Sequence, residues 1–185
     1  MKKLHIIIFC SILISCGIKN NKSEFDKIII DNELNSNLFN STEFMLNPLT
    51  LKTESGYDNV PDSTQYIVKS NAIVNKDSLR LMRFAELKRI GSDTLELNIF
   101  ETNPAYSQSL IIKIIDNRFK TEFNYWMSGP PIEPKIKRLK QELTVKSIPK
   151  QKGEMIFGKF YFKGICESDC SGEIEIEGDF KAELE

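Results

Sequence analysis

The chain of 185 residues carries 25 basic and 26 acidic side chains, and 41% of its residues are hydrophobic. This length and composition predict one globular domain plus a short additional segment at one end. Twelve Phe and only seven Pro supply ample core material, which argues against an intrinsically disordered chain. The balanced charge argues against a nucleic-acid binder, in which a basic excess normally gathers on one face.

The first sixteen residues have the pattern of a targeting signal. Lys2 and Lys3 precede an almost unbroken apolar run that ends at Cys16. This run is too short to span a hydrocarbon layer of about 30 Å, which requires about 20 residues. A charged start followed by a short apolar run is typical of a secretory signal peptide. We therefore expect residues 1–15 to be a signal peptide; the alternative is a short buried helix.

The segment Leu13-Ile14-Ser15-Cys16 resembles the lipobox of bacterial lipoproteins, in which a small residue precedes the cysteine that becomes lipidated. The resemblance implies cleavage before Cys16 and acyl chains on its sulfur and its amine, which together form a stable membrane anchor. If Cys16 is incidental, the segment is a plain secretory signal. Gly17 stands where an aspartate retains many inner-membrane lipoproteins, so the resemblance implies the outer membrane, facing the periplasm.

Polar residues follow the lipobox before the main domain begins. Cys16 and the Lys-, Asn- and Ser-rich stretch after it, residues 16–24, are predicted to form the lipidated tether. Residues 25–185 are predicted to form a single β-rich domain. In composition this domain resembles uncharacterised lipoproteins of AT-rich Gram-negative bacteria, a resemblance that implies no activity.

Of the four cysteines, two belong to the N-terminal segment. Cys10 would leave with the signal peptide and Cys16 would carry lipid, so Cys166 and Cys170 remain. An even number of cysteines in an oxidising compartment favours one disulfide. The alternative is a metal site that adds the carboxylates between them, but structural zinc sites use four ligands and usually a CxxC spacing. We therefore predict a Cys166–Cys170 disulfide and no metal site.

The residues around these cysteines predict a hairpin with Cys166 directly opposite Cys170. This register pairs apolar residues with apolar residues and lysines with glutamates: Phe162 with Ile174, Lys163 with Glu173, Lys159 with Glu177 and Gly158 with Gly178. A slip by one residue would turn every inward side chain outward. The disulfide would then join the two strands at the hairpin tip.

Alternating or continuous apolar patterns predict further strands over residues 94–100, 109–115, 118–126 and 139–145. The turn Asp116-Asn117 joins the second to the third. In the N-terminal half, residues 43–52 suit an edge strand, and residues 77–90 fit a helix slightly better than a strand. The predicted fold is mainly β: an antiparallel meander of about six strands, curled into a barrel or packed as a two-layer sandwich, with at most one or two short helices in the N-terminal half.

Sequence motifs for catalysis are few. Loss of His5 with the signal peptide would leave no histidine, which excludes Ser-His-Asp and Cys-His sites and most zinc hydrolases. The phosphate-binding GxxxxGK[ST] and dinucleotide-binding GxGxxG patterns do not occur in the sequence. Acidic residues after position 172 alternate with apolar ones, as on a solvated strand face. We expect no enzymatic activity, no catalytic residue and no cofactor.

The strongest candidate for binding is the aromatic and proline-rich segment 124–134, which contains the only tryptophan. Tyr125, Trp126 and Met127 lie just before its prolines. Tyrosine and tryptophan are frequent at binding hot spots, and prolines lower the entropy lost on binding. The alternative is that these side chains close the open end of the core. Replacement of Trp126 by Ala would separate the two.

These observations together predict a lipid-anchored, non-catalytic β-domain that binds a protein partner or ligand in the periplasm and binds no nucleic acid. One alternative is an immunity-type inhibitor, because such proteins are small, anchored and without catalytic residues. Another is a lipocalin-like carrier, which requires a barrel with an apolar cavity.

Overall fold

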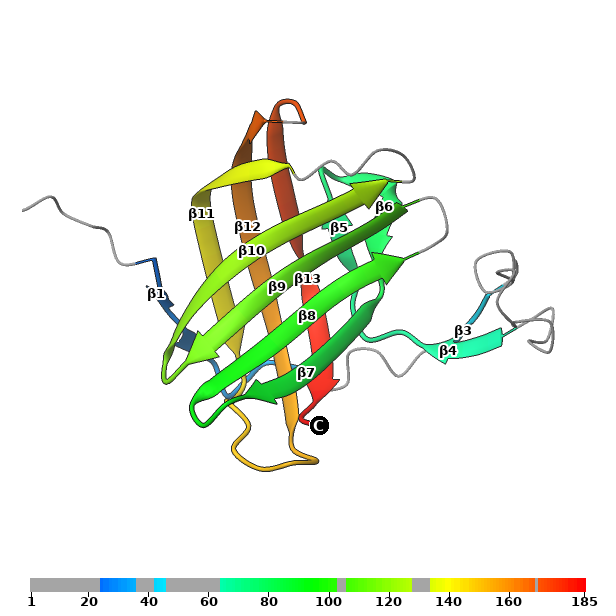
Figure 1. The fold of residues 1–185 in the computed structure, drawn as a ribbon. Helices are drawn as coiled ribbons and strands as arrows, with labels where there is room; N and C mark the ends of the chain where they lie inside the picture. Colours follow the sequence, from blue (N-terminus) through cyan, green and yellow to red (C-terminus); the bar gives the residue numbers. More distant parts are fainter. Residues whose placement is uncertain (1–23, 36–41, 46–63, 103–105, 128–133, 169) are drawn as a thin grey trace, which may run out of the picture.

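The computed structural model describes residues 24–35, 42–45, 64–102, 106–127, 134–168 and 170–185, drawn in colour in Figure 1. Within these ranges the regular elements are all β-strands. No described segment is a helix long and apolar enough to cross a membrane.

Two sheets make up most of the described chain. The first has five strands in the order β1 (Asp26–Lys27), β10 (Arg118–Met127), β9 (Tyr106–Ile115), β8 (Thr94–Thr102) and β7 (Phe84–Ile90). The second has six in the order β2 (Ile29–Ile30), β11 (Lys135–Val145), β12 (Met155–Ser168), β13 (Glu173–Glu183), β5 (Ala72–Val74) and β6 (Asp77–Met82). A separate pair consists of β3 (Thr42–Met45) and β4 (Thr64–Ile67).

The sheets form two layers whose strands cross one another in Figure 1. Neighbouring strands are antiparallel except for the short parallel pairing of β2 with β11. The mainly β prediction is confirmed. Of the two architectures left open by the sequence, the structure has the two-layer sandwich, and the sheets do not join into a closed barrel.

The core lies between the layers and follows the alternation along each strand. Leu95, Leu97 and Ile99 of β8 face inward, and the inward residues of β9 are equally buried. The largest fully buried side chains include Phe119 and Phe180. Because side chains alternate between faces with a period of two, each inward row is flanked by outward polar or half-buried residues.

The helix expected over residues 77–90 is wrong, because that segment forms β6 and β7. Ala85 and Leu87 of β7 alternate into the core with 1% and 0% exposure, a period that a helix cannot produce. Gly91, which would suit a helix C-terminus, has φ of +68° and instead turns the chain from β7 into β8. Both roles require a left-handed residue, so the glycine could not distinguish them.

The final hairpin and its disulfide are confirmed, but the predicted register is wrong by two residues. The structure pairs Lys163 with Glu175, Phe162 with Ile176 and Gly158 with Phe180. The backbone N–H of Cys166 donates to Gly172 O over 3.0 Å, so the loop is longer than the three-residue tip expected. The Cys166–Cys170 disulfide joins Cys166 of β12 to Cys170 in the connection to β13, rather than bridging two paired strands.

Close backbone approaches explain the observed register. A Cβ on Gly178 would lie 2.5 Å from the Cα of Ala72 in β5, and one on Gly158 would lie 2.6 Å from the ring of Phe180. Each glycine therefore lies where a neighbour leaves no room for a side chain. The predicted ion pair survives diagonally, because Lys163 Nζ lies 2.8 Å from Glu173 Oε2.

Gln141 of β11 joins the two sheets at their corner. Its side chain is 6% exposed; Oε1 accepts a hydrogen bond from Thr121 N at 2.8 Å, and Nε2 donates to Phe119 O at 3.2 Å. These bonds provide partners for backbone groups of β10 next to its short pairing with the two-residue strand β1. Leu139, two residues before Gln141, is 50% exposed because the pairing with β12 shifts register between Arg138 and Lys140.

Candidate binding site

A pocket opens between the sheets at the end of the sandwich where β10 finishes and the β12–β13 hairpin turns. We call it the end pocket; its volume is about 160 Å³. The described residues that line it come from both sheets and from the hairpin loop: Asn75, Arg80, Phe123, Tyr125, Pro134, Ile136, Cys170, Ser171 and Ile174.

The floor of the end pocket is apolar. Phe123 and Ile174 are buried, with 6% and 8% of their surfaces exposed, and Ile136 packs against the core beside them. The ring centroid of Phe123 lies 6.5 Å from that of Phe162. The floor is thus continuous with the hydrophobic core, because inward positions of both sheets meet there.

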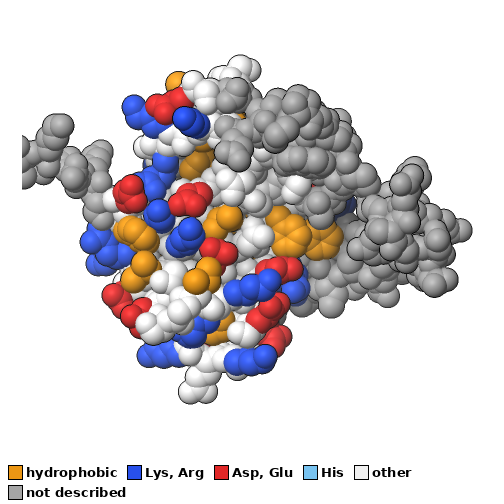
Figure 2. Space-filling view, in the orientation of Figure 1, with side chains coloured by type: hydrophobic (Ala, Val, Ile, Leu, Met, Phe, Trp, Pro, Cys, Tyr) orange, Lys and Arg blue, Asp and Glu red, His pale blue; other side chains and the backbone are white. Residues whose placement is uncertain are grey.

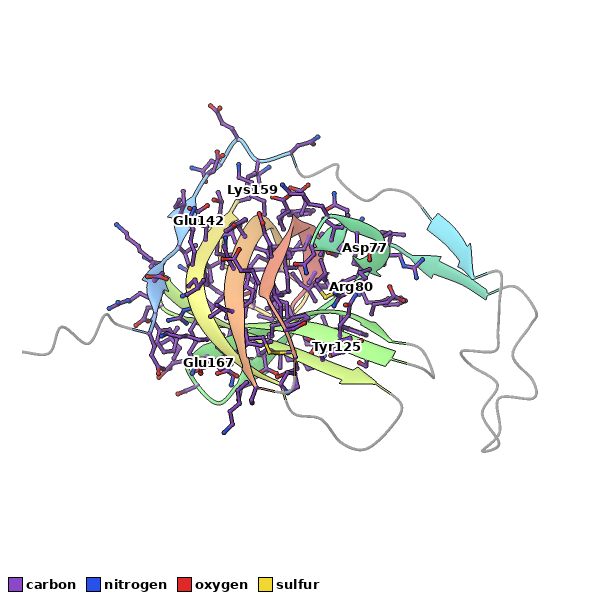
Figure 3. The ribbon with its side chains drawn as sticks, turned by 90° about the horizontal axis from the view of Figure 1, so that it is seen from above. Asp77, Arg80, Tyr125, Glu142, Lys159 and Glu167 are labelled. Atoms are coloured by element: carbon purple, nitrogen blue, oxygen red, sulfur yellow. A yellow bond between two sulfur atoms is a disulfide. The ribbon has the colours of Figure 1, made fainter. Side chains whose placement is uncertain are left out.

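Arg80 carries the only charge among the described residues that line the end pocket. Its position in β6 places the guanidinium over the ring of Tyr125, with Cζ 5.6 Å from the ring centroid (Figure 3). The described residues form no ion pair with Arg80. A cation over an aromatic face is held in place without being neutralised, so the charge remains available to an anion.

Arg83, three residues further along the chain, has a different environment. Its Nε and Nη2 donate to the two carboxylate oxygens of Glu101 at 2.8 and 3.0 Å, and Glu101 is 5% exposed. This bidentate arrangement is the strongest geometry for an arginine with a carboxylate. Of these two neighbouring arginines, therefore, Arg83 is neutralised by a buried carboxylate, whereas no carboxylate of the described residues pairs with Arg80.

A polar row crosses the inner face of the five-stranded sheet beside the pocket. Tyr125 pairs with Gln108, and Gln108 pairs with Glu101. Gln108 is 1% exposed; its Nε2 donates to Leu81 O at 3.3 Å, while its Oε1 has no hydrogen-bond partner among the described residues. Leaving a buried polar atom unpaired costs free energy, so this end of the sheet is less completely satisfied than the Gln141 corner.

The disulfide and the β5–β6 turn border the pocket. The Cα atoms of Cys166 and Cys170 are 5.6 Å apart, and Cys170 lines the pocket. Asn75 starts the β5–β6 turn with φ of +53°, and its Oδ1 accepts the backbone N–H of Glu175 at 2.7 Å. Covalent and backbone-directed bonds therefore fix both sides of the opening.

Two larger depressions differ from the end pocket in charge. One, of about 460 Å³, lies on the outer face of the six-stranded sheet, and Lys159 lies there together with Glu142, Glu177 and Asp179 (Figure 3). The other, of about 420 Å³, lies among the turns at the opposite end and also mixes acidic and basic residues. Interspersed charges of this kind are typical of a solvated surface.

The outer face of the five-stranded sheet has the same mixed character. Figure 2 shows basic and acidic side chains interspersed over this face. Lys120 Nζ lies 3.0 Å from Glu122 Oε1, and Lys113 Nζ lies 3.5 Å from Oε2 of the same glutamate. The hydrogen bond from Lys120 lowers the pKa of Glu122. These pairs place opposite charges side by side on this face.

The structure brings one of the three predicted binding residues to the end pocket. Tyr125 is half-buried, packs against the core and lines the pocket, so it closes the end of the core and its role in binding stays a prediction. Trp126 and Met127 continue β10 opposite Ser107 and Tyr106, but their side chains lie outside the described residues. Cys16 and residues 128–133 also lie outside them.

Arg80 is the residue that sequence reasoning missed. A lone arginine in an alternating strand carries no motif, and its role depends on β6 lying across from the end of β10. The described residues contain no cluster of three or more His, Cys, Asp and Glu side chains that could hold a metal ion.

Comparison with known proteins identifies no relative. No protein-family model, no curated protein and no solved structure matches this chain.

Proposed function

We propose that this chain is a lipid-anchored, non-catalytic domain of the bacterial periplasm that binds a protein partner through its end pocket. The single observation that carries the proposal is the composition of this pocket. Its floor is apolar and formed by both sheets, and its wall contains one arginine that no described carboxylate neutralises. An apolar concavity with one directed polar group is the usual design of a specific binding site.

The size of the end pocket supports a protein partner. Sites that enclose a whole small ligand measure about 300–1,000 Å³, whereas this pocket measures about 160 Å³. It therefore suits one side chain of a larger molecule, as a hot-spot pocket does. The space between the sheets is filled by Phe119, Phe162, Phe180 and their neighbours, which disfavours a lipocalin-like carrier.

The groups at the pocket suit binding rather than catalysis. A guanidinium stays protonated and cannot act as a general base, and a cysteine held in a disulfide is not a nucleophile. Arg80 and Cys170 are such groups. We therefore propose that the pocket recognises a partner without transforming it.

The anchor rests on the lipobox resemblance at Cys16. We propose that Cys16 carries the lipid and that the domain faces the periplasm from the outer membrane. Replacement of Cys16 by Ala should abolish incorporation of a clickable palmitate analogue and release the protein from the membrane fraction. An unchanged membrane fraction would contradict the anchor and leave the pocket proposal intact.

Site-specific photo-crosslinking in cells tests the partner. A photoreactive residue at Ser171, on the pocket wall, should crosslink a reproducible partner, and the substitution Arg80→Gln should abolish the adduct. The same residue at Lys159, on the outer face of the six-stranded sheet, and at Lys152, in the β11–β12 loop, serves as the matched control. Equal crosslinking from all three positions, or an adduct that persists with Arg80→Gln, would contradict the proposal.

A further inference from the structure

The end pocket restricts the chemistry of what it can bind. Its floor, formed by Phe123, Ile136 and Ile174, favours an apolar group, because transferring such a group out of water is favourable. Arg80 is its only charge among the described residues, so the complementary group is an anion. The bound group therefore combines an apolar body with one negative charge.

The position of Arg80 also limits the distance between the apolar group and the negative charge of the bound molecule. The guanidinium belongs to the pocket wall and is held 5.6 Å from the ring centroid of Tyr125, which itself lines the pocket. A volume of about 160 Å³ leaves space for a single side chain. The apolar group and the anion must therefore belong to the same residue or to atoms directly attached to it.

We propose, building on the partner-binding role above, that the end pocket binds the carboxyl-terminal residue of a peptide. Its apolar side chain lies on the floor against Phe123, and its α-carboxylate pairs with Arg80. A terminal Leu, Ile or Phe carries both groups on one Cα. An internal Asp or Glu supplies the anion, but its carboxylate is part of the side chain that would enter the pocket. No apolar group then covers the floor.

Arg80 is better placed than its neighbour Arg83 to bind the α-carboxylate. Arg83 already donates two hydrogen bonds to Glu101, a carboxylate that is 5% exposed. Arg80 is half-buried, so a carboxylate that reaches it is partly desolvated and its hydrogen bonds are stronger than on an open surface. Planar guanidinium groups bind carboxylates through two parallel hydrogen bonds.

Fluorescence anisotropy with the full-length protein in detergent tests the proposal. The probe is a fluorescein-labelled peptide ending in Gly-Ser-Gly-Leu with a free carboxylate. Three comparison peptides end in the carboxamide, end in Ser with a free carboxylate, or carry an internal Asp-Leu before a carboxamide. We expect each comparison peptide to bind at least about 10-fold more weakly than the probe. The carboxamide lacks the charge-assisted bond and the Ser peptide lacks the apolar contact. The Asp-Leu peptide carries the charge and the apolar group on two different residues.

Variants assign the effect to Arg80. Arg80→Gln should abolish the preference for the free carboxylate, and Arg80→Lys should retain part of it. Arg89→Gln, at the opposite end of the sandwich, is the matched control and should leave the preference unchanged. Thermal unfolding monitors folding of each variant; if Arg80→Gln does not fold, the peptide comparison with the wild-type chain and Arg80→Lys decides.

Equal affinity for the free acid and the carboxamide overturns the proposal. So does equal affinity for the internal Asp-Leu peptide, binding of none of the peptides at millimolar concentration, or an unchanged preference in Arg80→Gln. Crosslinking at Ser171 without carboxylate dependence removes this inference alone and leaves the partner-binding role. Carboxylate-dependent binding without a crosslinked partner supports the inference and removes the cellular role.

Discussion

The two ends of the sandwich are closed in different ways. At the end opposite the pocket, Gly91 and Asp116 turn the chain with φ of +68° and +53°, and the Glu154 carboxylate accepts the backbone N–H groups of Lys150 and Gln151 at 2.6 and 3.2 Å. At the pocket end, a disulfide loop and an arginine border an apolar floor. The first end satisfies its own backbone, whereas the second leaves side chains available to another molecule.

Truncation of two phenylalanines in the same strand should give the largest effect. Phe119→Ala, at the end of β10 opposite the pocket, should lower the free energy of unfolding by about 3–5 kcal/mol, because this side chain is 1% exposed and its loss leaves a cavity. Phe123→Ala should cost less, because its deletion enlarges a pocket that is already open. Denaturant unfolding measures both, and equal losses would contradict the contrast between the two ends.

Substitution of two buried glutamines tests how completely each region is hydrogen-bonded. Gln141→Leu should cost about 1–3 kcal/mol, because the buried N–H of Thr121 loses its acceptor. Gln108→Leu should cost less, because it also removes an oxygen that has no partner among the described residues. Urea unfolding of both variants checks the order; a larger loss for Gln108→Leu would show that the polar row near the pocket is the better satisfied region.

Removal of the disulfide should destabilise the pocket end. Cys166→Ser with Cys170→Ser opens a covalent loop of separation four, which lowers the unfolding free energy by about 2 kcal/mol in the chain-entropy treatment. Reduction with dithiothreitol should give the same decrease in thermal midpoint as the double substitution. A midpoint that is insensitive to reduction would mean that the loop contributes nothing to stability.

The smallest effect should be an acid sensitivity of the end opposite the pocket. Backbone hydrogen bonds from Lys150 and Gln151 hold the pKa of Glu154 below the usual 4.5. The folded pKa is lower than the unfolded one, so this stabilisation is present above pH 4.5 and is lost as the pH falls through the folded pKa. Between about pH 6 and about pH 3, the wild-type thermal midpoint should fall further than that of Glu154→Gln. Parallel curves would contradict the assignment.

The hairpin illustrates what alternation can and cannot predict. Alternation correctly separated inward Phe162 and Ile176 from outward Lys163, because a period of two assigns faces. It could not distinguish two registers that differ by two residues, since both keep every face. Contacts outside the hairpin decide between them: Gly178 must lie against Ala72 of β5, which is distant in sequence.

The candidate site was predictable only in part for a similar reason. Tyr125 was found because aromatic residues before a proline-rich segment are unusual in themselves. Arg80 lies in a segment whose pattern fitted a helix as well as a strand, and its significance arises only when β6 reaches the end of β10. An unusual residue such as Tyr125 can be recognised in the sequence. A contact between two residues that are brought together only by the strand order, such as Arg80 and Tyr125, cannot.

The pairing of β1 with the first residues of β10 sets the reach of the molecule. Asp26 lies opposite Phe119, while Tyr125 lies six residues further along the same strand, a displacement of about 20 Å at 3.3 Å per residue. Ten residue steps separate Cys16 from Asp26, and they can add at most about 35 Å. A lipid at Cys16 would therefore let the end pocket reach roughly 55 Å from the membrane surface. Within that distance the local concentration of the binding site would be high, and beyond it the site could not act.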